Sequence, residues 1–443
     1  MVNYWKEDIE TMPREELEKL QLKRAKGMIK RAYDKIKPLH ERYSEAGLTP
    51  DDLKELDDLA KFPLTHKDDL RDNYPFGLWA GKKEDAIRVH ASSGTTGKPI
   101  VCGYNKHDVY DVFAEVNARS LVACGLTEND VIQNAYGYGL FTGGLGIHYG
   151  GEMMGATVIP ISGGNTDRQL MLMQDFGSTA ITCTPSYMIY LAEEIVNRGI
   201  DPDKIKLKVG IHGAEPWSEK MRAKIEDLMP GMNAIDIYGL TEIIGPGVSV
   251  NCDINRYEGL HVWEDHFLPE VLDPDNDYER VAPGERGEIV FSTLTREVSP
   301  LPRYRAKDIS RLNYEKCKCG RTHARHDKIT GRTDDMLIIH GVNVFPSQIE
   351  SVLMNFEELS GYYQILVDRE KLGSLDRIKV KIELTEEHFS DKIKDLEAFT
   401  EKVADKLHST LLIHAHVELV APGTIPRSVG KAKRVVDLRG DKI

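Results

Sequence analysis

The sequence has few cysteines and no long apolar run. Six cysteines in 443 residues are too few for a disulfide framework. Cys102, Cys124 and Cys183 each stand alone in an apolar context and are expected to be buried free thiols. No apolar stretch approaches the ~18 residues that suggest a membrane span, and the acidic N-terminal stretch lacks a signal core. We therefore expect no membrane association, and the cytoplasm is the expected compartment.

The chain also lacks an excess of positive charge. It carries 58 Lys and Arg against 71 Asp and Glu, a formal net charge of −13. Nucleic acids require a positive surface, so they are not expected as partners. A single nucleotide could still bind in a locally basic or amide-rich cleft. The length and the 41% of hydrophobic residues fit a globular protein of two or more domains.

The spacing of apolar residues changes along the chain. It is helical over roughly the first sixty residues, and from about residue 86 short apolar runs alternate with glycine-rich turns and helical stretches. This alternation predicts an α/β fold with parallel or mixed sheets layered with helices, whose binding sites lie at the carboxyl ends of strands. We expect a large N-terminal domain with a β-rich subdomain (1–331), a hinge (332–335) and a small mobile α+β C-terminal domain (336–443).

The stretch SSGTTGK at residues 92–98 has the composition of a phosphate-binding loop. Its glycines allow backbone N–H groups to converge on an anion, and its hydroxyls add donors. A Walker loop has four residues between its glycines and a Ser or Thr after its lysine. Here two residues separate Gly94 from Gly97, and Pro99 follows Lys98. By itself the stretch fits either a phosphate site or a solvated turn.

Six motifs in order decide between these readings. They are SSGTTGKP (92–99), HGAEP (212–216), YGLTE (238–242), RYRAKD (303–308), GRTDD (331–335) and GK (430–431). The series resembles the adenylate-forming acyl-CoA ligase superfamily. Longer stretches such as FPLTHKDDLRDNYPFGL (62–78) and HVWEDHFLPEVLDP (261–274) look like the phenylacetate–CoA ligase family. The resemblance implies that ATP and an aryl acid give an acyl-AMP and pyrophosphate, and that the thiol of coenzyme A then displaces AMP.

The resemblance also implies roles for individual residues. Tyr238 would stack on adenine and Asp308 would bind the ribose hydroxyls, while Thr241 would reach the α-phosphate and Glu242 would hold Mg²⁺. Outside the motif, an isolated Tyr or Glu is more often structural, and Glu215 also fits a surface carboxylate. The implied nucleotide-binding positions are Ser92, Ser93, Gly94, Thr95, Thr96, Gly97, Lys98, Gly213, Ala214, Glu215, Pro216, Asp236, Tyr238, Gly239, Arg305, Asp308 and Arg332.

Two positions near the C-terminus imply domain motion. Lys431 matches the family lysine that stabilises charge during adenylation, with Lys433 as a nearby competitor. Asp334 matches the hinge, about which the C-terminal domain would turn to present its other face to coenzyme A. The alternatives are a solvated tail lysine and an ordinary turn. Together with Thr241 and Glu242, Lys431 makes up the expected catalytic set.

A glycine-rich stretch at 136–152 resembles the lining of the family's acid pocket. The expected substrate-binding residues are Tyr136, Phe141, Gly143, Ile147 and Pro246. The alternative is a glycine-rich strand–turn–helix packed in the core. A small aromatic acid fits these residues better than a fatty acid. Phenylacetate, a hydroxyphenylacetate, indoleacetate and benzoate all remain open.

Four cysteine and histidine residues outside these motifs have the chemistry of a structural zinc site. They are Cys252, His261, Cys317 and Cys319. A C-x-C pair is a weaker signal than C-x-x-C, so reduced thiols in surface loops are the alternative, and His266 and His323 compete as the fourth ligand. Clustered cysteines inside cells more often bind metal than form disulfides.

Two rival functions remain open. An adenylating enzyme could pass its acyl group to a carrier-protein thiol instead of coenzyme A. A non-catalytic nucleotide-binding or zinc-binding scaffold is the other, although it would have no chemical need for Lys431, Glu242 and Asp308 together. Pyrophosphate release that depends on an aryl acid separates enzyme from scaffold. The resemblance also suggests a homodimer.

Overall fold

The structure is a computed structural model, and it divides the chain into two compact units. It describes residues 2–92, 98–329, 331–333, 337–339, 342–369, 376–389, 393–411, 413–427 and 434–438. The first unit comprises Met1–Cys183, Asp201–Ala214 and Gly231–Lys328. The second comprises Thr184–Ile200, Glu215–Pro230 and Ile329–Ile443, so it includes two segments from the middle of the chain in addition to the C-terminal part.

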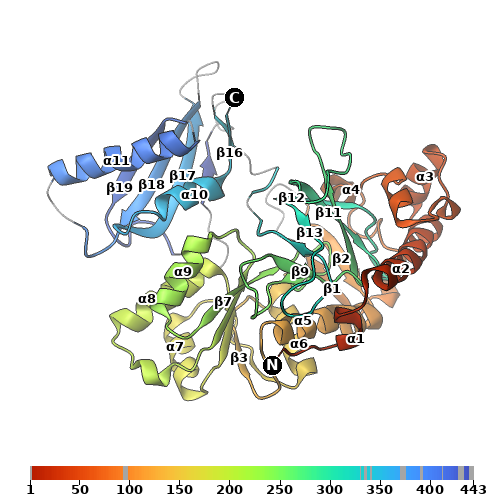
Figure 1. Cartoon of the computed structure of the whole chain (residues 1–443), viewed down its shortest axis with the longest axis horizontal. Helices are drawn as coiled ribbons and strands as arrows, with labels where there is room; N and C mark the ends of the chain where they lie inside the picture. Colours follow the sequence, from red (N-terminus) through yellow and green to blue (C-terminus); the bar gives the residue numbers. More distant parts are fainter. Residues whose placement is uncertain are drawn as a thin grey trace. The chain divides into compact units, whose positions relative to one another are not determined.

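The N-terminal region is helical, as the spacing predicts (Figure 1). Its helices are α1 (Glu7–Glu10), α2 (Arg14–Lys35), α3 (Lys37–Glu45) and α4 (Lys67–Asp72). The buried residues of α2 include Leu17, Gln21, Ala25 and Met28, three or four positions apart, which places them on one face. Pro38 lies in the first turn of α3, where its missing N–H costs no helical hydrogen bond.

A nine-stranded mixed sheet forms the centre of the first unit. Its strand order is β13-β14-β9-β8-β7-β6-β5-β3-β4, and the pairings from β7 to β4 are parallel. The strands are β3 (Val131–Asn134), β4 (Thr157–Ile159), β5 (Ala180–Cys183), β6 (Val209–Gly213), β7 (Asn233–Tyr238), β8 (Ser249–Val250), β9 (Leu260–Val262), β13 (Leu312–Asn313) and β14 (Arg325–His326). Both β5 and β6 are buried throughout, as expected for parallel strands covered on both faces.

Three further helices of the first unit pack closely because glycines lie between them. They are α5 (Glu115–Ala123), α6 (Gly143–Met154) and α7 (Thr166–Asp175), and a π-helical segment, Asp108–Ala114, leads into α5. A Cβ added at Gly150 of α6 would come within 2.6 Å of Asn117 Cβ in α5. The glycine-rich stretch at 136–152 therefore includes a helix that packs in the core.

Two smaller antiparallel sheets complete the first unit. One is the hairpin of β1 (Arg88–Ala91) and β2 (Val101–Tyr104), which flanks the SSGTTGK stretch. The other contains β10 (Phe267–Leu272), β11 (Gly287–Thr293) and β12 (Tyr304–Ser310), and it is the β-rich region that the sequence predicts. The register of β11 and β12 shifts between Glu288 and Val290, and Lys307 of β12 has a φ of 63°. Such bulges re-aim side chains and are common beside active sites.

The second unit has an α+β core, as predicted for the C-terminal part. Its four-stranded sheet has the order β19 (Ala415–Val420), β18 (Asp376–Leu384), β17 (Leu359–Arg369) and β20 (Val435–Asp437). Its remaining elements are β15 (Leu337–Ile339), β16 (Val342–Val344), α8 (Pro185–Asn197), α9 (Glu219–Leu228), α10 (Pro346–Leu353) and α11 (Ile393–Leu411). The core residues Ile349, Ile365, Val380 and Leu407 are buried together in one apolar cluster.

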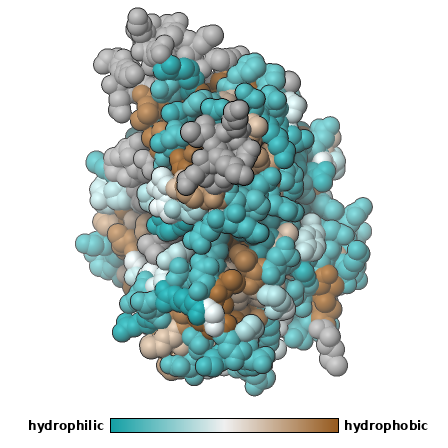
Figure 2. All heavy atoms as spheres, turned by 90° about the vertical axis from the view of Figure 1, so that its left-hand side faces the viewer, coloured by the Kyte–Doolittle hydropathy of each residue, from teal (hydrophilic) through white to brown (hydrophobic). Residues whose placement is uncertain are grey.

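The surface shown in Figure 2 is mainly hydrophilic, with hydrophobic residues in small separate groups. Among the described residues, no helix has the length and apolar character needed to cross a membrane. Cys102, Cys124 and Cys183 are buried free thiols, as expected.

Candidate functional site

The hairpin β1–β2 holds the base of the expected phosphate loop. The Ser92 N–H donates to Ile100 O at 3.0 Å, which closes the hairpin behind the loop. The Lys98 ammonium lies 5.4 Å from the centre of the Tyr74 ring, within cation–π range. The expected ligands Ser93, Gly94, Thr95, Thr96 and Gly97 lie outside the described residues.

The carboxyl ends of β6 and β7 approach each other closely. Gly213 pairs with Ile237, and a Cβ at Gly213 would lie 2.2 Å from Ile237 O. Only glycine fits this contact. The next residue, Ala214, has a φ of 70°, so the chain turns sharply away as β6 ends. Ligands bind at this edge of parallel sheets, so the turn forms part of a plausible nucleotide site.

Tyr238 and Asp308 meet although 70 residues separate them. The Tyr238 hydroxyl donates to Asp308 Oδ2 at 2.6 Å, and Asp308 is only 3% exposed. The Tyr238 ring also meets His326 edge-to-face, with centroids 5.1 Å apart. Burial lowers the pKa of His326 to about 4, so this imidazole is neutral near pH 7. The bond joins the end of β7 to the bulged strand β12.

Glu242 follows Tyr238 in a tight turn. Its side chain is buried, and its Oε1 lies 4.0 Å from the ammonium of Lys67 at the start of α4. The guanidinium of Arg296 donates to the Glu242 backbone carbonyl. A Cβ on Gly239 would lie 2.6 Å from Gly245 Cα, so the turn leaves no room for a side chain at position 239. Thr241 is half-buried in the same turn.

Two charged positions in the first unit already have protein partners. Arg305 donates from Nε and Nη2 to the two carboxylate oxygens of Glu288, at 2.7 and 2.8 Å. Asp236 Oδ2 lies 3.9 Å from the Lys328 ammonium. These contacts leave the Nη1 group of Arg305 as its part not paired with Glu288.

Three expected nucleotide residues belong to the second unit: Glu215, Pro216 and Arg332. The Glu215 carboxylate accepts from the Ser186 N–H at 2.8 Å, at the start of α8. A carboxylate at a helix N-terminus is stabilised by unpaired N–H groups, so Glu215 has a structural contact there. Asp334 and Lys431 lie outside the described residues.

The expected acid-pocket residues divide into two sets. Tyr136 packs beside Gly143, where an added Cβ would lie 3.6 Å from the tyrosine ring, and its hydroxyl donates to Cys183 O at 2.9 Å. Pro246 lies against α6, since a Cβ on Gly146 would come within 2.6 Å of the proline ring. By contrast, Ile147 is fully buried in the core and Phe141 is 51% exposed.

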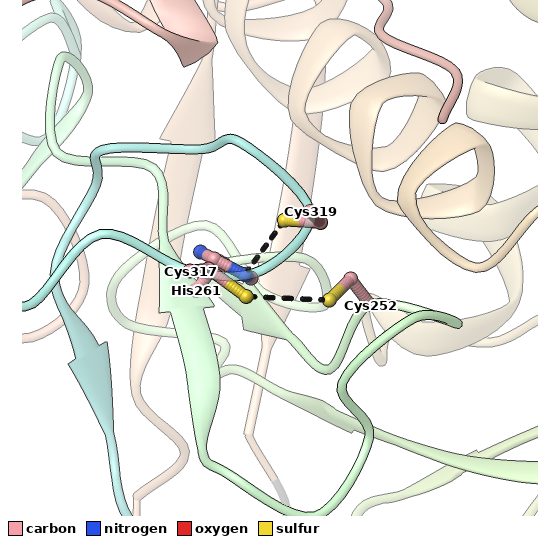
Figure 3. Close-up of side chains that lie close together, drawn as sticks. All are labelled: Cys252, His261, Cys317 and Cys319. Atoms are coloured by element: carbon pink, nitrogen blue, oxygen red, sulfur yellow. Dashed lines mark hydrogen bonds between the residues drawn. The ribbon is translucent and has the colours of Figure 1, made fainter. Parts of the chain in front are cut away.

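The structure brings together the four expected zinc ligands, all of them buried (Figure 3). His261 comes from β9, Cys252 follows β8, and Cys317 and Cys319 lie in the loop before β14. The ligand atoms all lie within 4.8 Å of one another. Cys252 Sγ and Cys317 Sγ are 3.9 Å apart, and Cys319 Sγ is 3.5 Å from His261 Nε2.

These distances fit the chemistry of zinc. Tetrahedral Zn–S bonds of about 2.3 Å place two sulfurs about 3.8 Å apart, far beyond a disulfide bond. The amide of Asn255 contacts Cys317 Sγ at 3.6 Å.

The competing histidines point elsewhere. Both ring nitrogens of His323 lie 3.0 Å from backbone carbonyls, those of Val262 and Ile9. His266 contacts Thr295 Oγ1 at 2.7 Å and the Glu115 carboxylate at 3.1 Å. The geometry therefore places His261, rather than either alternative, in the cysteine cluster.

Comparisons with known proteins show the family to which the chain belongs. A model of AMP-binding enzymes matches residues 16–295, and one of the AMP-binding enzyme C-terminal domain matches residues 341–439. The phenylacetate–coenzyme A ligase of Thermus thermophilus is 49% identical over 445 residues, covering 98% of this chain and 99% of its own. The Escherichia coli enzyme of the same name is 48% identical over 432 residues, covering 97% of each chain. The chain belongs to the phenylacetate–coenzyme A ligase family.

A solved relative shows the same fold over nearly the whole chain. The crystal structure of 2-hydroxyisobutyryl-CoA ligase in the postadenylation state is 29% identical, with a TM-score of 0.91. The match covers 99% of this chain and 93% of that one. The fold expected from the motif order, that of an AMP-forming acid–CoA ligase, is thereby confirmed.

Sequence reasoning missed three residues that contact the family motifs: Lys67, Arg296 and His326. Lys67 lies in the stretch FPLTHKDDLRDNYPFGL, which signalled the family without indicating what the lysine touches. Arg296 and His326 lie in no recognised motif. Their contacts with Glu242 and Tyr238 arise from the strand arrangement.

We predict that Gly213→Ala destabilises the protein, because the new methyl group would overlap Ile237 O. Overpacking of this kind costs about 1–3 kcal/mol. Gly137→Ala is the matched control, since a Cβ there meets no atom within 4 Å. Urea unfolding followed by tryptophan fluorescence should give a lower midpoint for Gly213→Ala only. Equal midpoints for the two variants would show that the strands separate without cost.

Proposed function

We propose that this chain converts phenylacetate, ATP and coenzyme A into phenylacetyl-CoA, AMP and pyrophosphate. The acid's carboxylate oxygen attacks the α-phosphorus, and pyrophosphate leaves. The thiol sulfur of coenzyme A then attacks the acyl carbon, losing its proton, and AMP leaves. The observation that carries this proposal is near-half identity to phenylacetate–CoA ligases over almost the full chain. The hydrogen bond between half-buried Tyr238 and buried Asp308 supports it, as does the buried Glu242 that follows Tyr238 in the chain.

In the nucleotide site, the chain's own residues would bind, orient and neutralise. Asp308 would accept from the ribose hydroxyls while Tyr238, whose hydroxyl holds Asp308 in place, presents its ring to adenine. Residues 92–98 would bind the outer phosphates through N–H groups and hydroxyls. The positions proposed to line the base and ribose are Gly213, Ala214, Glu215, Pro216, Asp236, Gly239, Arg305 and Arg332. Of these, Arg305 would act through Nη1, which lies 3.4 Å from His66 Nδ1, because its Nε and Nη2 groups pair with Glu288.

Magnesium would be held by Glu242. Its carboxylate is a hard oxygen ligand, buried beside a turn that also offers Thr241 to the α-phosphate. When bound, Mg²⁺ neutralises charge on the phosphates. The ammonium of Lys67, 4.0 Å from the Glu242 carboxylate, offsets part of its negative charge.

The aryl acid would bind beside α6. Tyr136 and Gly143 already pack together, and Pro246 lies on the same helix at Gly146. Phe141 and Ile147 are the further lining residues that the family resemblance implies. Small pockets of this kind select among similar acids by only about 1–3 kcal/mol per methylene.

We further propose a division of labour between domains, with a hinge at 332–335 and a C-terminal lid at 336–443. Lys431 would approach the carboxylate and α-phosphate during adenylation, and rotation at Asp334 would then admit coenzyme A. The family resemblance also supports a cytoplasmic homodimer acting in phenylacetate catabolism.

An ATP–pyrophosphate exchange assay with a panel of four aryl acids tests the proposed function directly. We expect ATP–pyrophosphate exchange to be fastest with phenylacetate among phenylacetate, hydroxyphenylacetate, indoleacetate and benzoate, because the named relatives act on phenylacetate. Adding coenzyme A should give the thioester with one AMP per product. Absence of exchange with every acid would point to a scaffold, and exchange with no thioester formed would point to a carrier-protein acceptor.

Lys431→Ala should separate the two half-reactions. A cation placed where charge develops contributes about 2.7–4 kcal/mol, so adenylation should slow about 10²–10³-fold. Thioester formation from supplied phenylacetyl-AMP should change little. Lys433→Ala is the control and should leave both rates near the unsubstituted level. Normal adenylation by Lys431→Ala would contradict the assignment.

We propose that the cysteine–histidine cluster binds a structural zinc ion. All four positions would be filled by protein groups, which leaves no open position for catalysis. The ligand loop also supports the N-terminus: the Tyr4 hydroxyl donates to Cys319 O at 2.6 Å, and Arg321 pairs with Glu10 at 2.7 Å in a fully buried contact. Zinc would therefore stabilise the docking of α1.

Metal analysis of protein purified without chelator should find about one zinc per chain. Cys317→Ser should lose the metal and unfold at a lower temperature, because three remaining ligands cannot close the site. Cys183→Ser, at a buried thiol of β5 whose sulfur lies against His212, should keep its zinc. Zinc-free protein from such a preparation would reject the proposal.

A further inference from the structure

We propose that Arg296 is a positioning residue for adenylation: its buried guanidinium fixes the Glu242 turn relative to strand β2, which follows the phosphate loop. The inference deepens the proposed function, because it rests on Glu242 as the magnesium-binding carboxylate. No sequence motif marks Arg296, which lies in the connection between β11 and β12.

The contacts of Arg296 join two parts of the site that are far apart in sequence. Its Nη1 donates to the backbone carbonyl of Glu242, and its Nη2 donates to Gly103 O at 3.4 Å. Its guanidinium carbon, Cζ, lies over the Tyr104 ring, 4.7 Å from the ring centre. Gly103 and Tyr104 are the last residues of β2. One side chain thus contacts both the metal-binding turn and the hairpin that carries residues 92–98.

The segment carrying Arg296 is itself fixed to β2 and to the π-helical segment Asp108–Ala114 that follows it. The Asp108 carboxylate accepts from the N–H groups of Glu297 and Val298, at 2.7 and 3.0 Å. The Gly103 N–H donates to Ser299 Oγ at 3.1 Å. These hydrogen bonds hold the backbone that follows Arg296. The Arg296 side chain therefore cannot easily shift away from Glu242.

Burying the positive charge of Arg296 costs folding free energy. The side chain is 2% exposed, and no carboxylate among the described residues lies within ion-pair distance of it. Its Nε has no hydrogen-bond partner in the described part of the chain. Burial opposes its charge, while Tyr104, Cys102 and Asp108 raise its pKa, so it stays protonated. A buried cation without a carboxylate partner destabilises a core, so an apolar residue would serve stability better.

The shape of the guanidinium explains why an arginine is needed. Its planar fork can donate to two carbonyls at once and stack on an aromatic ring, whereas a lysine offers one compact charge. With the guanidinium bound to both carbonyls, the hairpin and the Glu242 turn keep one relative position when the triphosphate binds. Without the guanidinium, the hairpin and the turn would move independently, and the Glu242 carboxylate would bind the metal less tightly.

The test measures metal affinity as well as rate. Mn²⁺ binding to the protein with a non-hydrolysable ATP analogue is followed by electron paramagnetic resonance. Arg296→Lys should weaken Mn²⁺ binding about tenfold, which corresponds to about 1.4 kcal/mol. The Mg²⁺ concentration giving half-maximal pyrophosphate exchange should rise by the same factor. Thioester formation from supplied phenylacetyl-AMP should change less than about twofold, since that step does not use the triphosphate.

Arg119→Lys is the control, because Arg119 is also fully buried but pairs with Glu115 and Asp265 outside the nucleotide motifs. It should leave Mn²⁺ affinity unchanged even if stability falls. Tyr104→Leu, which removes the ring beneath the guanidinium, is a second variant and should weaken Mn²⁺ binding about threefold if the fork depends on it. Unchanged Mn²⁺ affinity in either folded variant, or an equal loss in both half-reactions, would overturn the inference. Failure of the unsubstituted protein to adenylate phenylacetate would instead reject the proposed function.

Discussion

The hydrogen bond between Tyr238 and Asp308 is the constraint on which the site depends. It joins the last residue of β7 in the nine-stranded sheet to the bulged strand β12 of a different sheet. At 2.6 Å and with Asp308 buried, it is a short charge-assisted bond in a poorly solvated place, where such bonds are strongest. Breaking it would remove a donor from a buried carboxylate. The two sheets are thereby held in one arrangement, and the edge of β7 keeps its orientation toward the turn that carries Glu242.

Around this bond, the protein uses buried polar groups where apolar packing would be more stable. Arg296 holds the Glu242 turn through a backbone carbonyl, and neutral His326 supports the Tyr238 ring from the side. In the same sheet, His261 of β9, which only β8 separates from β7, contributes to the cysteine cluster. These features all restrict which way a loop or ring can lie. Apolar contacts are non-directional and cannot do this, whereas hydrogen bonds and metal ligands fix direction as well as distance.

The family, the fold class and the main motifs could be read from the chain because they depend on local order. The glycine spacing at residues 92–98 and the apolar runs of β5 and β6 are local patterns. Each depends only on residues that are neighbours in the sequence. The zinc ligands were a harder case: the four residues could be named, but His266 and His323 competed with His261 as the fourth ligand. Strand pairing chose among them, because β9 and β14 lie side by side and direct His261 toward Cys319.

The sequence by itself determined which elements form and which chemistry the loops can perform, since helix and strand periodicity and glycine content act over a few residues. Tertiary structure alone decided that Lys67 and Arg296 meet Glu242, that Tyr238 binds Asp308, and that Arg305 is engaged with Glu288. The physical reason is that such contacts depend on strand order, register and one bulge in β12. Those are set by packing summed over the whole unit, and no short stretch of residues contains that information.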